Sequence, residues 1–174
     1  MMPDILIRPE TPADAAAISA LTTAAFAGAE HSDGTEAQII ERLRAANALL
    51  LSLVAERDGQ ILGHVAFSDV TIGGHDRGWV GLGPVSVAPG AQAGGIGSAL
   101  IRAGLAQLQA QGRKGCVVLG DPAYYTRFGF SADLAARFAS PFAGEHLMAM
   151  MLDPAAVWPV AGRADYAPAF ARMG

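Results

Sequence analysis

A strand, a glycine-rich loop and the start of a helix follow one another from Leu82 onward, and this order suits an anion site. The strand carries β-branched residues at Val85 and Val87, and the loop has glycines at positions 90, 94, 95 and 97. The first backbone N–H groups of a helix have no partner within it, and the helix dipole favours negative charge there. Glycines let the backbone approach a ligand closely, since no Cβ intervenes. The sequence therefore predicts a phosphate-binding site.

Two well-known phosphate loops are excluded by single residues. A Walker loop needs a lysine directly after its last glycine, whereas the lysine of this chain is Lys114, far from the loop. A dinucleotide fingerprint needs a third glycine three residues after Gly97, where Leu100 stands. The ligand of the loop must therefore be a different phosphate compound.

Two motifs in the right order identify that ligand by resemblance. The segment Gln92-Ala93-Gly94-Gly95-Ile96-Gly97 resembles the acetyl-CoA signature Q/R-x-x-G-x-G/A of the GCN5-related N-acetyltransferase (GNAT) superfamily. A second block, YYTRFGF at residues 124–130, is similar to the block that follows one helix and one strand later in that superfamily. The resemblance extends over residues 5–152, and the wording GDPAYYTRFGF is similar to that of the bacterial YhbS-like acetyltransferases.

The resemblance implies an α/β fold of GNAT type, in which helices cover both faces of a central, mostly antiparallel, twisted sheet with a splayed central strand. It implies acetyl-CoA as co-substrate, with the pantetheine arm along Val85 and Val87 and the Val85 N–H donating to the thioester oxygen. Tyr125 matches the tyrosine that protonates the departing sulfur in many members. The pyrophosphate would lie on the backbone of Gln92, Ala93, Gly94, Gly95, Gly97 and Ser98.

The general base is less clearly marked. Some members carry a glutamate on the central strand, but residues 81–84 read Gly-Leu-Gly-Pro and hold no acid. Glu30 and Glu36 are favoured, because acceptor contacts come from that region in the resembled fold. His31, His64 and a base acting through a water chain remain alternatives. Many members carry a glycine and then a basic residue directly after the motif glutamine, where this chain has Ala93 and Gly94. The missing positive charge predicts weaker cofactor binding.

These features predict direct transfer of an acetyl group to a primary amine, with a small molecule favoured over a protein as acceptor. Two alternatives stay open. One is an acyl-CoA-binding sensor without turnover, which the absence of an acid on the central strand favours. The other is a protein N-acetyltransferase. The resemblance also implies a homodimer, and it implies no metal ion.

Composition agrees with one domain spanning residues 1–174. The net charge of −4 and the absence of a basic cluster argue against nucleic acid as a partner. The longest apolar stretch, residues 45–55, is too short to cross a membrane, and the first residues lack a secretory pattern. A single cysteine, Cys116, excludes an internal disulfide and suits the cytoplasm.

The elements that must position these residues follow from periodicity and turn signals. Asp58-Gly59 is typical of a two-residue hairpin turn, and a further turn is expected over residues 73–78. The C-terminal extension, residues 153–174, is expected to lie extended over the surface after Pro154. His64 and Cys116 fall in apolar strands and are expected to be structural. Strands are predicted over residues 5–8, 51–56, 61–67 with an extension at 70–72, 79–87, 116–119 and 145–152, and helices over 11–26, 35–46, 98–111 and 122–127.

Overall fold

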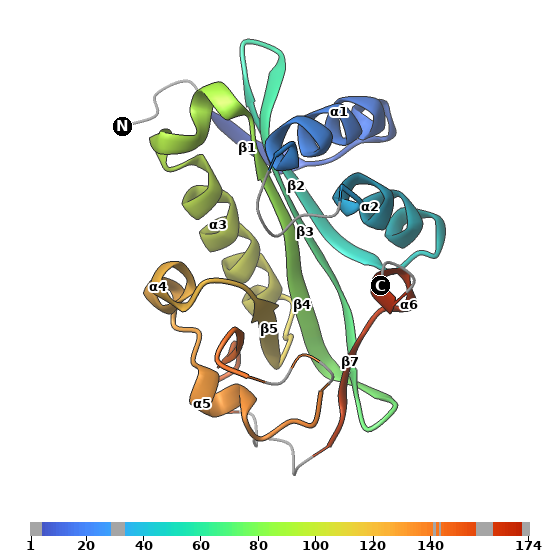
Figure 1. Ribbon diagram of the computed structural model, residues 1–174, viewed down its shortest axis with the longest axis vertical. Helices are drawn as coiled ribbons and strands as arrows, with labels where there is room; N and C mark the ends of the chain where they lie inside the picture. Colours follow the sequence, from blue (N-terminus) through green and yellow to red (C-terminus); the bar gives the residue numbers. More distant parts are fainter. Residues whose placement is uncertain (1–4, 29–33, 141, 143, 156–161, 172–174) are drawn as a thin grey trace.

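A seven-stranded sheet forms the centre of the protein in the computed structural model, which describes residues 5–28, 34–140, 142, 144–155 and 162–171. Six strands lie in chain order across the sheet, and the seventh pairs with β3 (Figure 1). All neighbours are antiparallel except β4 and β5, which run parallel. The strands are β1 (Leu6–Pro9), β2 (Leu49–Arg57), β3 (Gln60–Ile72), β4 (His75–Val87), β5 (Gly115–Leu119), β6 (Leu147–Met151) and β7 (Ala164–Tyr166).

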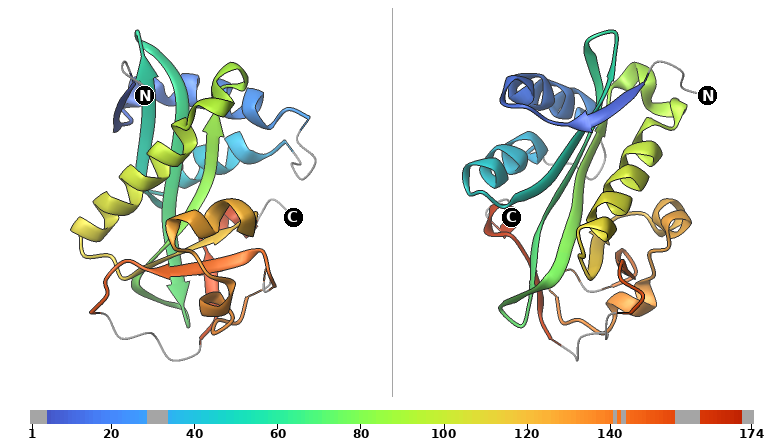
Figure 2. Two further views of the ribbon diagram at one scale, coloured as in Figure 1. Left: turned by 90° about the vertical axis from the view of Figure 1, so that its left-hand side faces the viewer. Right: turned by 180° about the vertical axis from the view of Figure 1, so that it is seen from behind.

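Helices cover both faces of this sheet, as the resemblance implied. α1 (Ala15–Phe26) and α2 (Glu36–Ala45) lie on one face, and α3 (Ile96–Ala110) lies on the other (Figure 2). The short helices are α4 (Pro122–Tyr125), α5 (Ala132–Ala135) and α6 (Pro168–Ala171), and 3-10 turns span Pro12–Asp14, Pro89–Gly94 and Thr126–Phe128. No helix in the described ranges is both long and apolar enough to cross a membrane.

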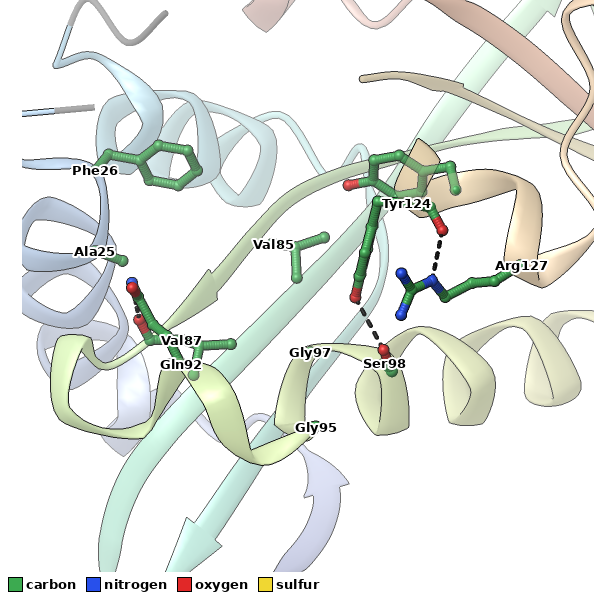
Figure 3. A pocket seen from close by; sticks show the side chains of 11 residues that line it. Ala25, Phe26, Val85, Val87, Gln92, Gly95, Gly97, Ser98, Tyr124 and Arg127 are labelled. Atoms are coloured by element: carbon green, nitrogen blue, oxygen red, sulfur yellow. Dashed lines mark hydrogen bonds between the residues drawn. The ribbon is translucent and has the colours of Figure 1, made fainter. Parts of the chain in front are cut away.

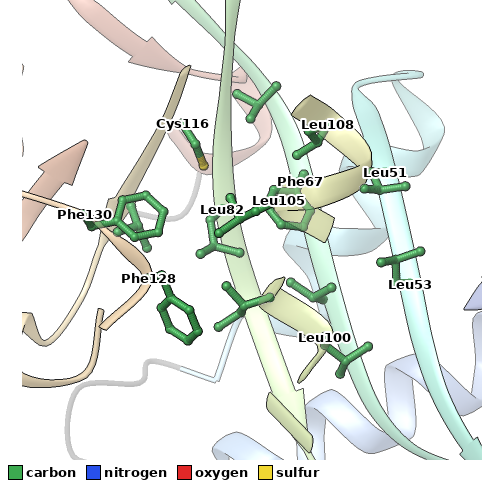
Figure 4. Close-up of a cluster of buried hydrophobic side chains, with 14 of the residues drawn as sticks. Leu51, Leu53, Phe67, Leu82, Leu100, Leu105, Leu108, Cys116, Phe128 and Phe130 are labelled. Atoms are coloured by element: carbon green, nitrogen blue, oxygen red, sulfur yellow. The ribbon is translucent and has the colours of Figure 1, made fainter. Parts of the chain in front are cut away.

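The main core lies between α3 and the sheet (Figure 4). Leu100 and Leu108 of α3 are fully buried, because apolar residues recur at helical spacing on the side that faces the strands. Phe67 of β3 packs directly against Gly104, where any side chain would collide with the ring. This close approach fixes α3, and therefore the loop that precedes it, against the strands.

The central strand β4 separates from β5 halfway along its length. The two strands pair from Trp79 and Gly115 only as far as Leu82 and Val118, whereas β4 continues to Val87. Beyond that point β4 is paired with β3 alone. The splayed central strand expected from the resemblance is present, and one edge of β4 is exposed to a gap.

Alternation along β4 shows which backbone groups face the gap. The N–H of Ala88 donates to the carbonyl of Leu62 in β3 at 2.8 Å. In an antiparallel pair every second residue directs both its N–H and its C=O to the partner strand. Ser86 therefore faces β3 as well, and the backbone groups of Val85 and Val87 face the gap.

Most predicted elements are confirmed within one or two residues, including the hairpin at Asp58-Gly59, where both residues have positive φ. The turn predicted over residues 73–78 is shorter. Only Gly73 and Gly74 form it, and β4 begins at His75, because the residues that follow pair with β3. Asp76 and Gly78, which had suggested a longer turn, form a local contact within β4 instead: the Gly78 N–H donates to the Asp76 carboxylate.

The C-terminal segment is not an extended surface appendage, and that expectation is wrong. β7 pairs with residues 70–72 of β3, where β2 has already ended and left the edge of β3 open. Ala167 and Ala169 are buried against Ile39 and Leu43 of α2. The segment therefore covers both the open edge of β3, which would otherwise leave backbone groups unpaired, and the apolar side of α2.

Candidate active site

The predicted anion site is built at the amino terminus of α3. Gly95 adopts the left-handed conformation, with φ +80°, and is the N-cap of the helix. The first helical hydrogen bond runs from the Ala99 N–H to the Gly95 carbonyl at 3.0 Å. The N–H groups of residues 95–98 therefore have no acceptor within the helix and can bind an anion.

A cavity of about 550 Å³ opens between this helix terminus, the free edge of β4 and the block of residues 124–130 (Figure 3). Its lining includes most of the predicted cofactor residues. Gly94, the last residue of the preceding 3-10 turn, is not among them. The side chain of Ala93 lies outside the described residues. The cavity is lined by Ala25, Phe26, Val85, Val87, Gln92, Gly95, Gly97, Ser98, Tyr124, Tyr125 and Arg127.

Gln92 joins the loop to the strand edge. Its side-chain amide donates to the carbonyl of Val87 at 3.1 Å (Figure 3). The motif glutamine therefore holds the loop beside β4 through its side chain, in addition to the backbone role that the sequence predicted. The Val87 carbonyl therefore already accepts one hydrogen bond, and its second lone pair can accept another from a ligand.

Tyr124 and Arg127 form a part of the site that sequence reasoning missed. The hydroxyls of Tyr124 and Ser98 are hydrogen-bonded at 3.1 Å, which connects α4 with the start of α3. The guanidinium of Arg127 lies 4.5 Å from the centre of the Tyr124 ring, and its Nε donates to the Tyr124 carbonyl at 2.8 Å (Figure 3). The sequence motifs assign neither residue a role in the site. The available signal was the basic residue inside the YYTRFGF block.

Tyr125 is held in a partly buried position by neighbours on several sides. Its ring packs edge-on against Tyr124 and Phe130, and Gly120 leaves the space that the ring occupies. Burial raises the pKa of Tyr125 to about 12, and the neighbouring Tyr124 and Cys116 act in the same direction. The phenol is therefore protonated at neutral pH and has a proton to donate.

A second cavity of about 360 Å³ lies next to the first and shares Phe26, Val85 and Tyr125 with it. Glu36, one of the predicted bases, is in its lining. Glu30 and His31 lie outside the described residues. The second cavity is lined by Phe26, Glu36, Ile39, Leu82, Gly83, Pro84, Val85, Leu119, Tyr125, Phe142, Tyr166 and Phe170.

His64 is a structural residue, and its candidacy as a base is wrong. Its side chain is fully buried in β3, with Nε2 hydrogen-bonded to the Ser52 hydroxyl at 2.7 Å. Ser52 also donates to Glu10, which forms an ion pair with Arg44 at 2.9 Å. Burial lowers the pKa of His64 to about 4. The residue lines neither cavity, because it faces this polar cluster on α2's side of the sheet.

The described residues contain no group of three or more His, Cys, Asp and Glu side chains that could hold a metal ion. The polar side chains that the structure describes around the two cavities are instead hydroxyls, one amide, one carboxylate and one guanidinium. This set suits binding of phosphates and transfer of protons.

Comparison with known proteins agrees with this geometry. Residues 50–132 match the acetyltransferase (GNAT) domain family. The chain is 43% identical to the N-acetyltransferase YhbS of Escherichia coli over 127 residues, which is 72% of this chain and 73% of the relative.

Two solved structures extend the likeness to nearly the whole chain. A GNAT family acetyltransferase from Brucella melitensis in complex with acetyl-CoA has a TM-score of 0.83 and 48% identity, covering 95% of this chain and 97% of that one. YhbS from Escherichia coli in complex with CoA has a TM-score of 0.87 and 36% identity, covering 98% and 94%.

Proposed function

Because the chain belongs to the GNAT acetyltransferase family, we propose that it binds acetyl-CoA in the first cavity and transfers the acetyl group to a small-molecule primary amine held in the second. The observation that carries this proposal is the junction of the two cavities at Val85 and Tyr125. A thioester placed there lies between a backbone donor, a protonated phenol and an acceptor.

The cofactor would lie along two backbone surfaces. The pyrophosphate would accept hydrogen bonds from the N–H groups at residues 95–98, and the pantetheine amides would pair with the free edge of β4 at Val85 and Val87. Arg127 would supply the positive charge that Gly94 lacks, since its guanidinium lines the same cavity. The likeness to proteins solved with acetyl-CoA and CoA supports this placement.

The chemistry is direct attack on the thioester. The amine arrives as an ammonium ion and first loses one proton, for which we propose Glu36 or Glu30 as the base. The nitrogen lone pair then attacks the carbonyl carbon, and the oxygen, as it gains negative charge, accepts from the Val85 N–H. The C–S bond breaks, the thiolate takes the proton of Tyr125, and the proton released by the amide nitrogen returns to the phenolate. The products are an N-acetylamine, CoA thiol and one proton.

Turnover is tested by incubating the purified protein with acetyl-CoA and a panel of primary amines and measuring free thiol together with the acetylated amine. We expect both products in equal amounts. Thiol without acetylated amine would indicate hydrolysis and would contradict the proposal.

A sensor without turnover is the second candidate, and one observation favours it. Residues 81–84 of β4 carry no acid, so no base lies on the strand beside the thioester. Tight binding of CoA with no acetylation of any amine would support the sensor.

Two further expectations from the sequence stay predictions. We place the protein in the cytoplasm, because its one cysteine, Cys116, is buried and unpaired. A homodimer stays a family-based prediction that sedimentation of the purified protein would test.

A further inference from the structure

We propose that the acceptor is a monoamine carried on an aromatic or similarly bulky apolar group, and that the second cavity binds this group. The inference rests on the proposed function, because it takes the second cavity as the acceptor side of the thioester. Three independent features of the cavity support it: its walls, its exposed apolar side chains and its charge.

The walls are rings contributed by segments far apart in the sequence. Phe26 ends α1, Tyr125 belongs to α4, and Tyr166 and Phe170 come from β7 and α6. Tyr166 lies at the centre of a cluster, with its ring 5.9 Å from that of Phe142 and 5.1 Å from that of Phe170. Aromatic rings favour stacked or edge-on contact with another ring, so an aromatic ligand would gain more here than a hydrophilic one.

Exposed apolar side chains are concentrated at this cavity. Among the described residues, three large apolar side chains are strongly exposed: Leu6 at 54%, Leu119 at 45% and Phe142 at 41%. Leu119 and Phe142 both line the second cavity. Apolar surface grouped at a cavity marks a place where a ligand can remove it from water.

The charge of the described lining favours a single positive group. Glu36 is the one carboxylate among the lining residues that the structure describes, and no Lys, Arg or His is among them. An acceptor with a carboxylate or phosphate would find no cation to balance it. A polyamine would have to leave additional ammonium groups unpaired against apolar walls, which is costly. One ammonium near Glu36 with an apolar body fits this distribution.

The test is equilibrium binding of amines to the CoA-loaded protein, measured by calorimetry, with phenethylamine and tryptamine compared with ethanolamine and spermidine. We expect the aromatic amines to bind at least about tenfold more tightly than ethanolamine, because one ring buries that much apolar surface. Equal or tighter binding of ethanolamine or spermidine would overturn the inference. Tighter binding of a peptide with an apolar first residue would also overturn it and would indicate a protein acceptor.

Matched variants test whether the ring of the bound amine lies in the second cavity. Phe142→Ala should weaken phenethylamine binding about tenfold. Leu6→Ala removes an even more exposed apolar side chain, on β1 and outside the lining of the cavity, and should leave the affinity unchanged. Glu36→Gln should weaken every amine. Unchanged affinity in Phe142→Ala would contradict the inference. Binding of aromatic amines without acetylation would contradict the proposed function, because no acceptor would exist, but would leave the second cavity as a site for aromatic amines. Acetylation without the expected preference for aromatic amines would contradict the inference alone.

Discussion

At the level of single residues, Tyr125 has the properties that a proton donor to the thiolate needs. It lines both cavities, its ring is fixed by aromatic neighbours, and burial keeps its hydroxyl protonated by raising its pKa to about 12. The sequence motif predicted the residue. Its ring packs among Gly120, Phe128 and Phe130, which are close to it in the sequence. Its place between the cavities depends on Phe26 and Val85, which only the folded chain brings beside it.

Tyr125→Phe is expected to lower kcat by a hundredfold or more, as is typical for loss of a general acid, on the order of 10²–10⁴. The affinity for CoA should change little, because the ring remains. Steady-state kinetics and calorimetry measure the two quantities.

The raised pKa also predicts that wild-type kcat does not decline through deprotonation of Tyr125 below about pH 11. In Tyr125→Phe, parallel loss of kcat and of CoA affinity would show that the Tyr125 hydroxyl contributes to CoA binding and is not the proton donor.

His64 should make stability depend on pH. The pKa of His64 is about 4 in the folded protein and about 6.5 when unfolded, so between these values only the unfolded chain takes up a proton. With respect to His64, the free energy of unfolding should therefore have its full value above pH 6.5 and fall by roughly 3 kcal/mol as the pH drops to 4.

Urea unfolding at several pH values measures this slope. His64→Gln should flatten it, because glutamine does not titrate, while the exposed His75→Gln should leave it unchanged. An equal slope in wild type and His64→Gln would assign the pH dependence to other groups.

At the level of elements, the strand, loop and helix from β4 to α3 act as one binding unit. Gly97 is in the first turn of α3, and a Cβ there would lie 3.5 Å from Val87 Cγ2 and Tyr124 Oη, which is ordinary contact. The protein thus has room for a side chain at this position, but that side chain would occupy the cavity.

Gly97→Val is expected to reduce CoA affinity by at least a hundredfold, because it blocks approach to the backbone N–H groups, and to change the free energy of unfolding by no more than about 1 kcal/mol. Calorimetry and urea unfolding test the two parts. Gly90→Ala, where a Cβ meets nothing, is the control and should bind normally. Normal CoA binding by Gly97→Val would show that the cofactor lies elsewhere.

For the whole molecule, the C-terminal segment completes both the sheet and the second cavity. The ring of Tyr166 covers Gly81 of β4, and a Cβ on Gly81 would come within 2.6 Å of the Tyr166 ring and 3.1 Å of Val70. The proposed acceptor side of the site therefore depends on contact between β4 and β7, which are far apart in the sequence.

Gly81→Ala is expected to destabilise the protein by about 1–3 kcal/mol through overpacking, and to weaken amine binding more than CoA binding. In a Tyr166→Ala background the same substitution should cost clearly less, since the crowding ring is gone. A double-mutant cycle of urea unfolding measures this coupling. Additive effects would show that Tyr166 is not the residue that Gly81 accommodates.

The sequence by itself determined the family and nearly all helices and strands, and it predicted the cofactor loop and the role of Tyr125. These depend on local patterns: alternation, helical spacing, and glycines next to a helix start. Local patterns could not determine the place of the C-terminal segment, since β7 is directed by an open edge of β3 more than ninety residues earlier in the chain. Local patterns also could not show that His64 is buried and hydrogen-bonded to Ser52, or that the Arg127 guanidinium packs on the Tyr124 ring. Only the tertiary structure brings five distant segments together as the second cavity, because burial and cavity shape are properties of contacts between residues that are remote in sequence.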